Sequence, residues 1–236
     1  EKEGAGEAGG EVGGEVDDGL LAKFDRLFIV YNDAMRLVAK EAADGKTSGM
    51  SDERVAELEL LHSYLGYHRL LHTVRRNLLL IEQHKAKLGA ASKCHELVRF
   101  YDAIAQNITD MAALPVVTSH PTPAPSARLA FDLAGFRVLR LNALALAHLE
   151  PTPAPPAATH NALALYSLAI DLAAASSTLP SPGAFLTPAT LAALSTAAQI
   201  ARIQLHARAT LASLPSSLAA RLESLSLSAP NPAPPA

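Results

Sequence analysis

Apolar side chains recur at three- and four-residue intervals over much of the first half of the chain. In the segment 20–38 they are Leu20, Phe24, Leu27, Phe28, Tyr31, Met35 and Val38. In the segment 97–111 they are Leu97, Phe100, Tyr101, Ile104, Ile108 and Met111. This spacing gathers apolar side chains on one face of an α-helix. Because no segment sustains an alternation of polar and apolar residues, the sequence predicts helices and no strands.

Capping residues set the expected limits of the first helix. Acidic residues suit a helix N-terminus, so this helix is expected to begin near Asp17 or Asp18. Gly45 is the expected stop. Residues 1–19 combine glycine with seven acids and one lysine, a composition that predicts a disordered leader.

Similar signals bound the next two helices. Ser51 can cap a second helix that runs to Leu88. Such a helix is unusually long, so a break near Gly66 or after Arg76 is an alternative to a continuous one. A third helix is expected over 92–114, where a following proline ends it.

The second half of the chain alternates Pro/Ala-rich segments with Ala/Leu-rich blocks of helical length. The proline segments HPTPAPS, PTPAPPA, LPSPGAF and NPAPPA favour extended backbone. Between them, helices are expected over about 126–149, 159–179, 187–214 and 216–227. Thr159, Thr187 with Pro188, and Ser216 with Ser217 are the expected start signals.

The sequence therefore predicts an all-α fold, an antiparallel array of about seven helices joined by Pro/Ala-rich loops. Ala162, Tyr166 and Ala169 have the A-x3-Y-x2-A spacing of a tetratricopeptide repeat, so the array is expected to be similar to such repeats. We expect a helical protein-binding domain over 20–227 and a Pro/Ala-rich tail over 228–236.

Charge and composition argue against several classes of function. Residues 1–118 hold 14 Lys/Arg and 19 Asp/Glu, and residues 119–236 hold 6 Arg and 4 acids, so the chain lacks the broad basic field of a nucleic-acid-binding surface. Prolines interrupt the uncharged stretch between Asp171 and Arg202, so membrane insertion is not expected. The single cysteine, Cys94, excludes an intramolecular disulfide and favours a reducing compartment.

Three histidines in LHSYLGYHRLLH raise the question of a metal or catalytic site. On a helical wheel His62 faces away from His68 and His72. His68 and His72 have the spacing of the two histidines in an HExxH zinc site. The residues between them are Arg-Leu-Leu, so the glutamate that would act as general base is missing, and no third ligand is nearby. We interpret both as packing histidines of a helix face. The sequence predicts no enzyme, cofactor, metal or small-molecule substrate.

Two motifs resemble consecutive signatures of one family. LELLHSYLGYHRLLHTVRRN (58–77) and ELVRFYDAIAQNITDMAALP (96–115) are similar to segments of the 68-kDa protein subunit of the eukaryotic signal recognition particle. Residues 20–41 resemble the preceding family helix more loosely. The motif positions singled out, expected to be structural, are His62, Tyr64, Tyr67, Arg76, Asn77, Arg99, Tyr101, Asp102, Gln106 and Asn107.

The resemblance implies a non-catalytic, protein-binding region that forms a heterodimer with the 72-kDa subunit of the particle. In the family a separate domain, which nothing here resembles, binds the particle RNA. The implied role is co-translational targeting of secretory proteins to the endoplasmic reticulum, in the cytoplasm, after assembly in the nucleolus. The alternative is a free-standing helical-repeat adaptor that binds peptides.

A short helix near the C-terminus is the expected contact with the partner. Leucines at i, i+4 and i+7 behind a proline suit the helix-in-groove mode of recognition. The residues of this hypothesis are Leu218, Arg221, Leu222 and Leu225.

Overall fold

The computed structural model describes residues 13–88, 94–150, 155–179 and 183–213 of the 236-residue chain. These ranges contain seven helices and no strand, which confirms the all-α prediction. The helices are α1 (Gly13–Ser48), α2 (Asp52–Leu88), α3 (Cys94–Ala113), α4 (Pro115–Thr118), α5 (Ala124–Leu149), α6 (Pro156–Ser176) and α7 (Pro188–Ser213).

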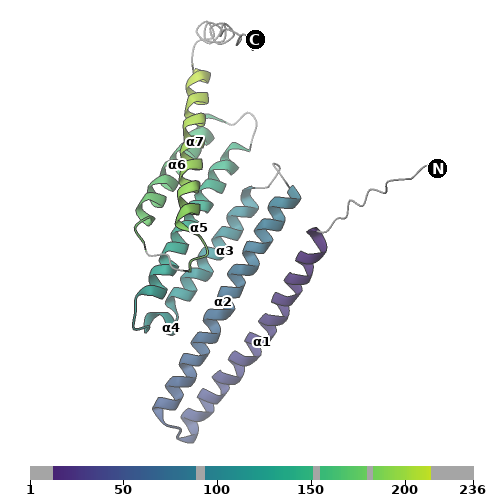
Figure 1. Ribbon diagram of the computed structural model, residues 1–236, viewed down its shortest axis with the longest axis vertical. Helices are drawn as coiled ribbons and strands as arrows, with labels where there is room; N and C mark the ends of the chain where they lie inside the picture. Colours follow the sequence, from purple (N-terminus) through teal and green to yellow (C-terminus); the bar gives the residue numbers. More distant parts are fainter. Residues whose placement is uncertain (1–12, 89–93, 151–154, 180–182, 214–236) are drawn as a thin grey trace, which may run out of the picture.

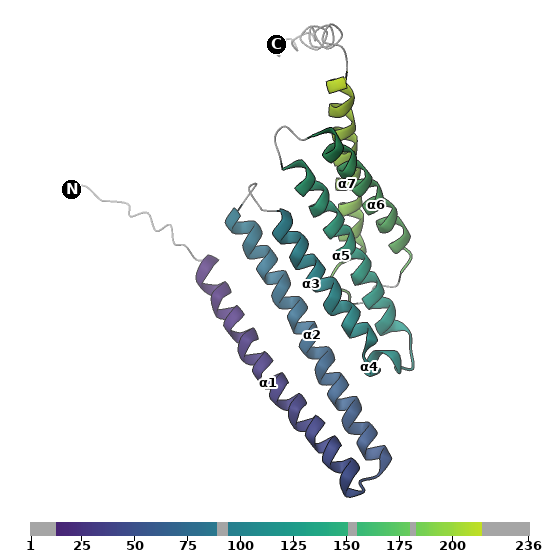
Figure 2. The ribbon, with the colours of Figure 1, turned by 180° about the vertical axis from the view of Figure 1, so that it is seen from behind.

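The long helices lie side by side in chain order. Each contacts the next in the series α1, α2, α3, α5, α6 and α7, while α4 is a short turn between α3 and α5 (Figure 1). The lower end of the α1–α2 hairpin extends past α4, as both ribbon views show (Figure 2). Each end of the array therefore consists of a helix that contacts neighbours on one side. In the described helices, no segment is long and apolar enough to cross a bilayer.

The first helix extends beyond both predicted limits. It begins at Gly13, so the described part of the leader 13–19 is helical rather than disordered. Adding residues to an existing helix costs far less than nucleating one, which explains the extension. Residues 1–12 lie outside the described ranges.

The C-terminal end of α1 shows why Gly45 was the wrong stop. The residue with left-handed backbone is Gly49, with φ of 80°, and the N–H of Met50 donates to the Gly45 carbonyl at 3.0 Å. This is the six-residue closure of a Schellman motif. Gly45 serves the same turn differently, because a Cβ there would lie 2.8 Å from the Met50 sulfur.

The second helix is continuous, without the break that the sequence left open. Its cap is the predicted one, since the Arg54 N–H donates to Ser51 Oγ at 3.4 Å. Gly66 stays helical and faces α1, where a Cβ would lie 3.5 Å from Met35 Cε. The glycine thus permits close packing of the α1–α2 hairpin.

Helices α6 and α7 begin at prolines, and not always at the predicted threonines. α6 begins at Pro156 rather than Thr159, because proline is favourable in the first turn, where its missing N–H costs no bond. The predicted cap at Thr187 is confirmed, since the Thr190 N–H donates to its Oγ1 at 3.0 Å. The short helix α4 was not predicted, and the segment 216–227 lies outside the described residues.

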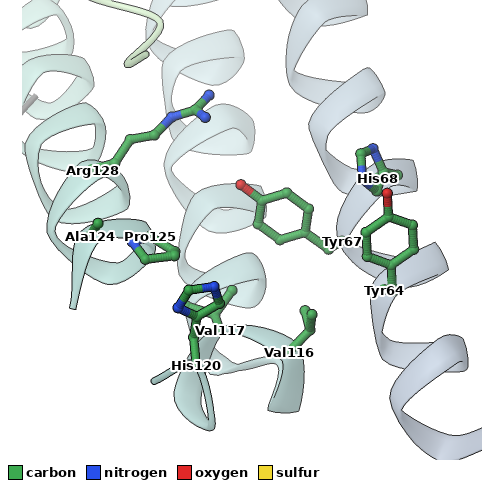
Figure 3. A pocket seen from close by; sticks show the side chains of 9 residues that line it. All are labelled: Tyr64, Tyr67, His68, Val116, Val117, His120, Ala124, Pro125 and Arg128. Carbon is green, nitrogen blue, oxygen red and sulfur yellow. The ribbon is translucent and has the colours of Figure 1, made fainter. Parts of the chain in front are cut away.

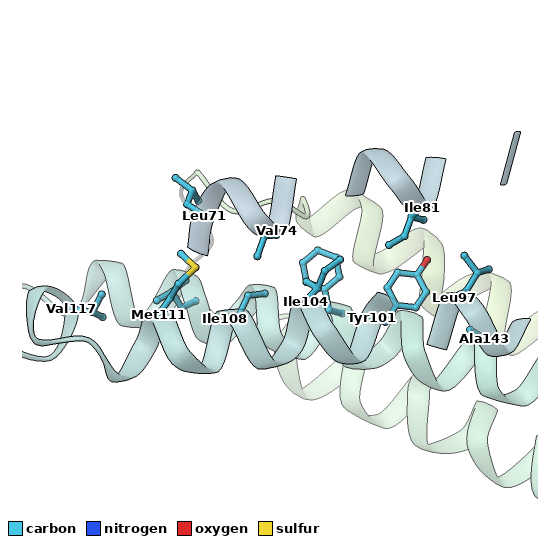
Figure 4. Close-up of a cluster of buried hydrophobic side chains, with 12 residues drawn as sticks. Leu71, Val74, Ile81, Leu97, Tyr101, Ile104, Ile108, Met111, Val117 and Ala143 are labelled. Carbon is cyan, nitrogen blue, oxygen red and sulfur yellow. The ribbon is translucent and has the colours of Figure 1, made fainter. Parts of the chain in front are cut away.

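The main core joins α2, α3 and α5, and the two sequence motifs supply most of it. Figure 4 shows their side chains meeting between the helices. Ile104, Ile108 and Met111 are fully buried there. The cluster contains Leu71, Val74, Ile81, Leu97, Tyr101, Ile104, Ile108, Met111, Val117, Leu129, Phe136 and Ala143.

A hydrogen bond also links the two motifs. Ser63, buried in the first motif, accepts the N–H of Val116 at 3.0 Å, directly after the proline that ends the second. The bond satisfies a backbone donor where α3 gives way to α4. The two motifs therefore build one interface.

Candidate partner-binding surface

The outer face of α7 is apolar and open. Ile203 is 64% exposed, and Ile200 and Leu211 are more than half exposed. Their spacing of three and eight residues places them near one line along the helix. The only Lys, Arg, Asp or Glu residues of α7 are Arg202 and Arg208, and Arg202 turns to donate to Ser167 Oγ at 3.3 Å.

The inner face of α7 packs on small residues of α5 and α6. Ala162, Tyr166 and Ala169, the repeat-like trio, are all buried. Ala162 and Tyr166 form a cluster with Ala145 of α5 and Ala198 of α7. Small side chains let these helices approach closely, which fixes the orientation of the open face.

A buried carboxylate anchors the segment that leads into α7. Asp132 on α5 is fully buried, and its Oδ1 accepts the N–H groups of Phe185 at 2.8 Å and Leu186 at 3.2 Å. Burial raises the pKa of Asp132 to about 6, although these two bonds and the charge of Arg128 act in the opposite direction. The sequence analysis did not identify this residue.

Arg128 completes the anchor. Its Nε lies 3.9 Å from Asp132 Oδ2, and its guanidinium lies 5.8 Å from the centre of the Phe185 ring. The remaining Asp132 oxygen and the Arg128 Nε are buried without a hydrogen bond among the described residues. The pair is therefore held by charge and packing rather than by a direct hydrogen bond.

A recess of about 330 Å³ lies between α2 and the α4–α5 turn. Figure 3 shows Tyr67 projecting into it from α2 toward Arg128, with Tyr64 and His68 beside it on the same helix. Burial lowers the pKa of His68, and the neighbouring His72 and Arg75 lower it further. The lining residues are Tyr64, Tyr67, His68, Val116, Val117, His120, Ala124, Pro125 and Arg128.

The titratable side chains that line this recess are Tyr64, Tyr67, His68, His120 and Arg128. None of its lining residues is a carboxylate or a cysteine, so His68 and His120 have no acidic partner there. In the described ranges, no three His, Cys, Asp or Glu side chains come together as metal ligands. The arrangement can hold an apolar or aromatic group.

The other histidines of the first motif face α1. His72 packs against Phe24 and Tyr31, with ring centres 6.3 and 5.6 Å away. His62 lines a groove against the C-terminal part of α1. The helical wheel paired His68 with His72 correctly, since their ring centres lie 6.5 Å apart. His62 lines a different groove from His68, as the wheel also predicted.

The remaining motif residues stabilise contacts between helices or lie at the surface. Arg76 Nε lies 3.4 Å from Asp25 Oδ1 on α1, and Asp102 pairs with Arg140 on α5. Gln106 donates to Asp110 at 2.8 Å. The rest divide by exposure: Tyr101 is buried, Asn77 and Asn107 are half-buried, and Arg99 is exposed.

The predicted contact residues near the C-terminus cannot be placed on the surface. Leu218, Arg221, Leu222 and Leu225 lie outside the described ranges. Their role remains a prediction.

Comparison with protein families finds a match to the family described as RNA-binding signal recognition particle 68, over residues 2–230. Comparison with curated proteins and with solved structures finds no match. The family match covers both motifs and also the Pro/Ala-rich second half, where the resemblance in sequence was weaker. It spans nearly the whole chain, and the chain therefore belongs to the family of the 68-kDa subunit of the signal recognition particle.

Proposed function

We propose that this chain is the region of the 68-kDa subunit that binds the 72-kDa subunit, and that it acts without catalysis. Family membership over residues 2–230 carries the proposal. The exposed apolar face of α7 supports it, because that face ends at Ser213, directly before the leucine-rich segment 216–227. The two together would form one continuous apolar contact.

The physical driving force is burial of this apolar surface. Transfer of apolar area from water contributes about 25 cal/mol per Å². A stable interface needs roughly 1,200 Å² or more in total. A partner that covers α7 and also holds the leucines at 218, 222 and 225 in a groove would bury both surfaces in one interface.

In the particle, the resulting heterodimer would sit on the particle RNA and take part in targeting nascent secretory chains to the endoplasmic reticulum. The family description includes RNA binding. The net charge of −3 argues that another part of the subunit supplies most of the RNA contact. We place the assembled protein in the cytoplasm, with assembly in the nucleolus.

Co-purification with the 72-kDa subunit tests the proposal. The variants are Ile203→Asp on α7 and a chain truncated after residue 214, and the matched control is Ile29→Asp on α1, where the isoleucine is 62% exposed. Ile203→Asp is expected to weaken binding about tenfold or more, since a charge at an apolar contact must be desolvated. The truncated chain is expected to weaken it by a similar factor, since it lacks the leucines at 218, 222 and 225. The control is expected to bind like the wild type.

Two results would contradict this assignment. Unchanged affinity in both test variants would remove α7 and the tail from the interface. Binding of particle RNA by the chain, without any binding of the 72-kDa subunit, would assign it to the RNA-binding part of the family instead.

A further inference from the structure

A second surface lies away from α7, in a groove that α3, α5 and α6 form together. The three helices are neighbours, with α5 between the other two (Figures 1 and 2). The groove has a volume of about 530 Å³. It is lined by Asp102, Ala105, Gln106 and Thr109 of α3, Leu133, Arg137, Arg140 and Leu141 of α5, and Leu168 and Leu172 of α6.

The two walls of this groove differ in chemistry. The α3 wall carries Asp102, Gln106 and Thr109, which repeat at four and three residues and so share one helix face. The α6 wall carries Leu168 and Leu172, one turn apart. Leu168 is 54% exposed, which is unusual for a leucine inside a packed array. A ligand must therefore present polar groups on one side and apolar groups on the other.

The floor of the groove is positively charged. Arg140 pairs with Asp102 through Nε, and its side chain is only half-buried. Arg137, one turn earlier on α5, is exposed and makes no hydrogen bond or ion pair within the described ranges. Two arginines against one aspartate give the groove an excess positive charge. A carboxylate fits this charge, because a guanidinium can bind it with two parallel hydrogen bonds.

The dimensions of the groove match one face of a helix. The α3 wall extends from residue 102 to 109, which corresponds to about 10 Å, or two helical turns. Leucines one turn apart can interdigitate with a partner's apolar side chains at the same spacing. This is the geometry of a helix bound in a groove formed by other helices.

RNA fits the groove less well than a peptide. Nucleic-acid grooves combine several cations along the backbone with aromatic side chains on which bases stack. The ten lining residues include two arginines, no lysine and no aromatic side chain, and four of them are leucines.

We propose that this groove binds an acidic amphipathic helix of a partner protein. The helix would place paired leucine-type side chains against Leu168 and Leu172 and a flanking glutamate or aspartate against Arg137 and Arg140. The proposal does not depend on the proposed contact of α7 with the 72-kDa subunit, since no residue of α7 lines the groove.

The probe is a phage-displayed library of random 16-residue peptides, selected on the full 236-residue chain. Selected peptides are synthesised with a fluorescent label, and their affinity is measured by fluorescence polarisation. They are expected to carry an acid beside a pair of apolar residues three or four positions apart. Arg137→Glu is expected to weaken them about tenfold, since attraction becomes repulsion, and Leu168→Asp at least as much.

Two further measurements separate groove binding from loss of structure. A lysine version of a selected peptide is expected to bind Arg137→Glu more tightly than it binds the wild type, which a misfolded variant cannot produce. Leu146→Asp on α5, where the leucine is 49% exposed and outside the groove, is the matched control and should bind normally.

The proposal is overturned if no peptide is selected, if selected peptides lack acids, or if Arg137→Glu binds them unchanged. A single-stranded 15-nucleotide RNA serves as a separate arm. Binding of that RNA with loss in Arg137→Glu, without peptide binding, would make the groove an RNA contact. A concentration-dependent increase in mass that Arg137→Glu abolishes would make it a contact between copies of this chain.

Discussion

We expect Asp132 to lower the stability of the fold at neutral pH, and its replacement by asparagine to remove that effect. Its carboxyl is fully buried, and burial raises its pKa from the ordinary 3.8 to about 6. Between these values the folded state binds the proton more tightly than the unfolded chain. By linkage, the free energy of unfolding falls as pH rises through this window. The stability that the protonated carboxyl provides is therefore fully present below pH 3.8 and is lost as pH rises through about 6.

The magnitude follows from the two pKa values. At 1.36 kcal/mol for each pH unit between them, full ionisation lowers the stability by about 3 kcal/mol. About half of this loss falls between about pH 5 and about pH 7.5. In Asp132→Asn the Oδ1 atom still accepts the two backbone N–H groups. The new amide NH2 group replaces Oδ2, which lies 3.9 Å from Arg128 Nε, so two donors then face each other. That mismatch costs about 1–2 kcal/mol at every pH.

Urea unfolding followed by circular dichroism at 222 nm gives the required comparison. Asp132→Asn is expected to be more stable than the wild type by about 1–2 kcal/mol near pH 7.5. Its advantage is expected to shrink by about 1.4 kcal/mol on lowering the pH to about 5, where the two proteins have nearly the same stability. Asp171→Asn, the same change at an exposed position of α6, is the matched control and should show a flat difference.

A pH-independent difference between Asp132→Asn and the wild type would refute the reasoning. It would mean that the carboxylate is solvated or fully paired, and that burial does not dominate its environment. Asp132→Ala sharpens the test, because it leaves the N–H groups of Phe185 and Leu186 without an acceptor. It is expected to lose stability at every pH, by about 2–4 kcal/mol.

Three further substitutions test the helix ends and the core by the same unfolding measurement. Gly49→Ala should lower the free energy of unfolding by about 1 kcal/mol because the φ of Gly49 is 80°. Gly19→Ala should raise it by about 0.5–1 kcal/mol, because this position is inside α1 and a Cβ there has nothing within 4 Å. Equal effects of the two substitutions would contradict the Schellman assignment. Ile108→Ala should cost about 4 kcal/mol, because the side chain is fully buried, and a loss below about 1 kcal/mol would contradict that packing. Ser63→Ala should cost about 1–2 kcal/mol by leaving the Val116 N–H without its acceptor, with Ser63→Thr as the variant that keeps the hydroxyl.

The sequence predicted what depends on local spacing. Helical periodicity over 97–111 identified a face whose members are nearly all buried, and Ser51 and Thr187 cap the helices they were expected to cap. The predicted end of α1 was wrong because the end of this helix depends on the α1–α2 turn, where Met50 packs against Gly45. Without that contact, the sequence does not show which of two glycines four residues apart ends the helix.

The site residues depended on contacts between distant segments. The donors to Asp132 follow it by more than fifty residues, in a loop rich in proline and glycine. The one local signal was an acid within LAFDLAGF, on the helix face shared with apolar side chains. Likewise, Arg137 and Leu168 come together only because α6 folds back on α5, and no spacing rule links them.

The two ends of the array differ in a way that favours α7 over α1 as the proposed docking face. Both outer helices expose isoleucines, Ile29 on α1 and Ile203 on α7, to nearly the same extent. On α1 the neighbouring positions carry charges, including the exposed pair of Asp33 and Arg36 at 3.0 Å. Covering that face would desolvate these charges, which opposes the gain from apolar burial. The residues one turn from Ile203 on α7 are uncharged apart from the titratable His206, so burial there is opposed by much less. The asymmetry explains why Ile29→Asp is the informative control, and an equal loss of partner binding in both variants would show that exposure alone determines docking.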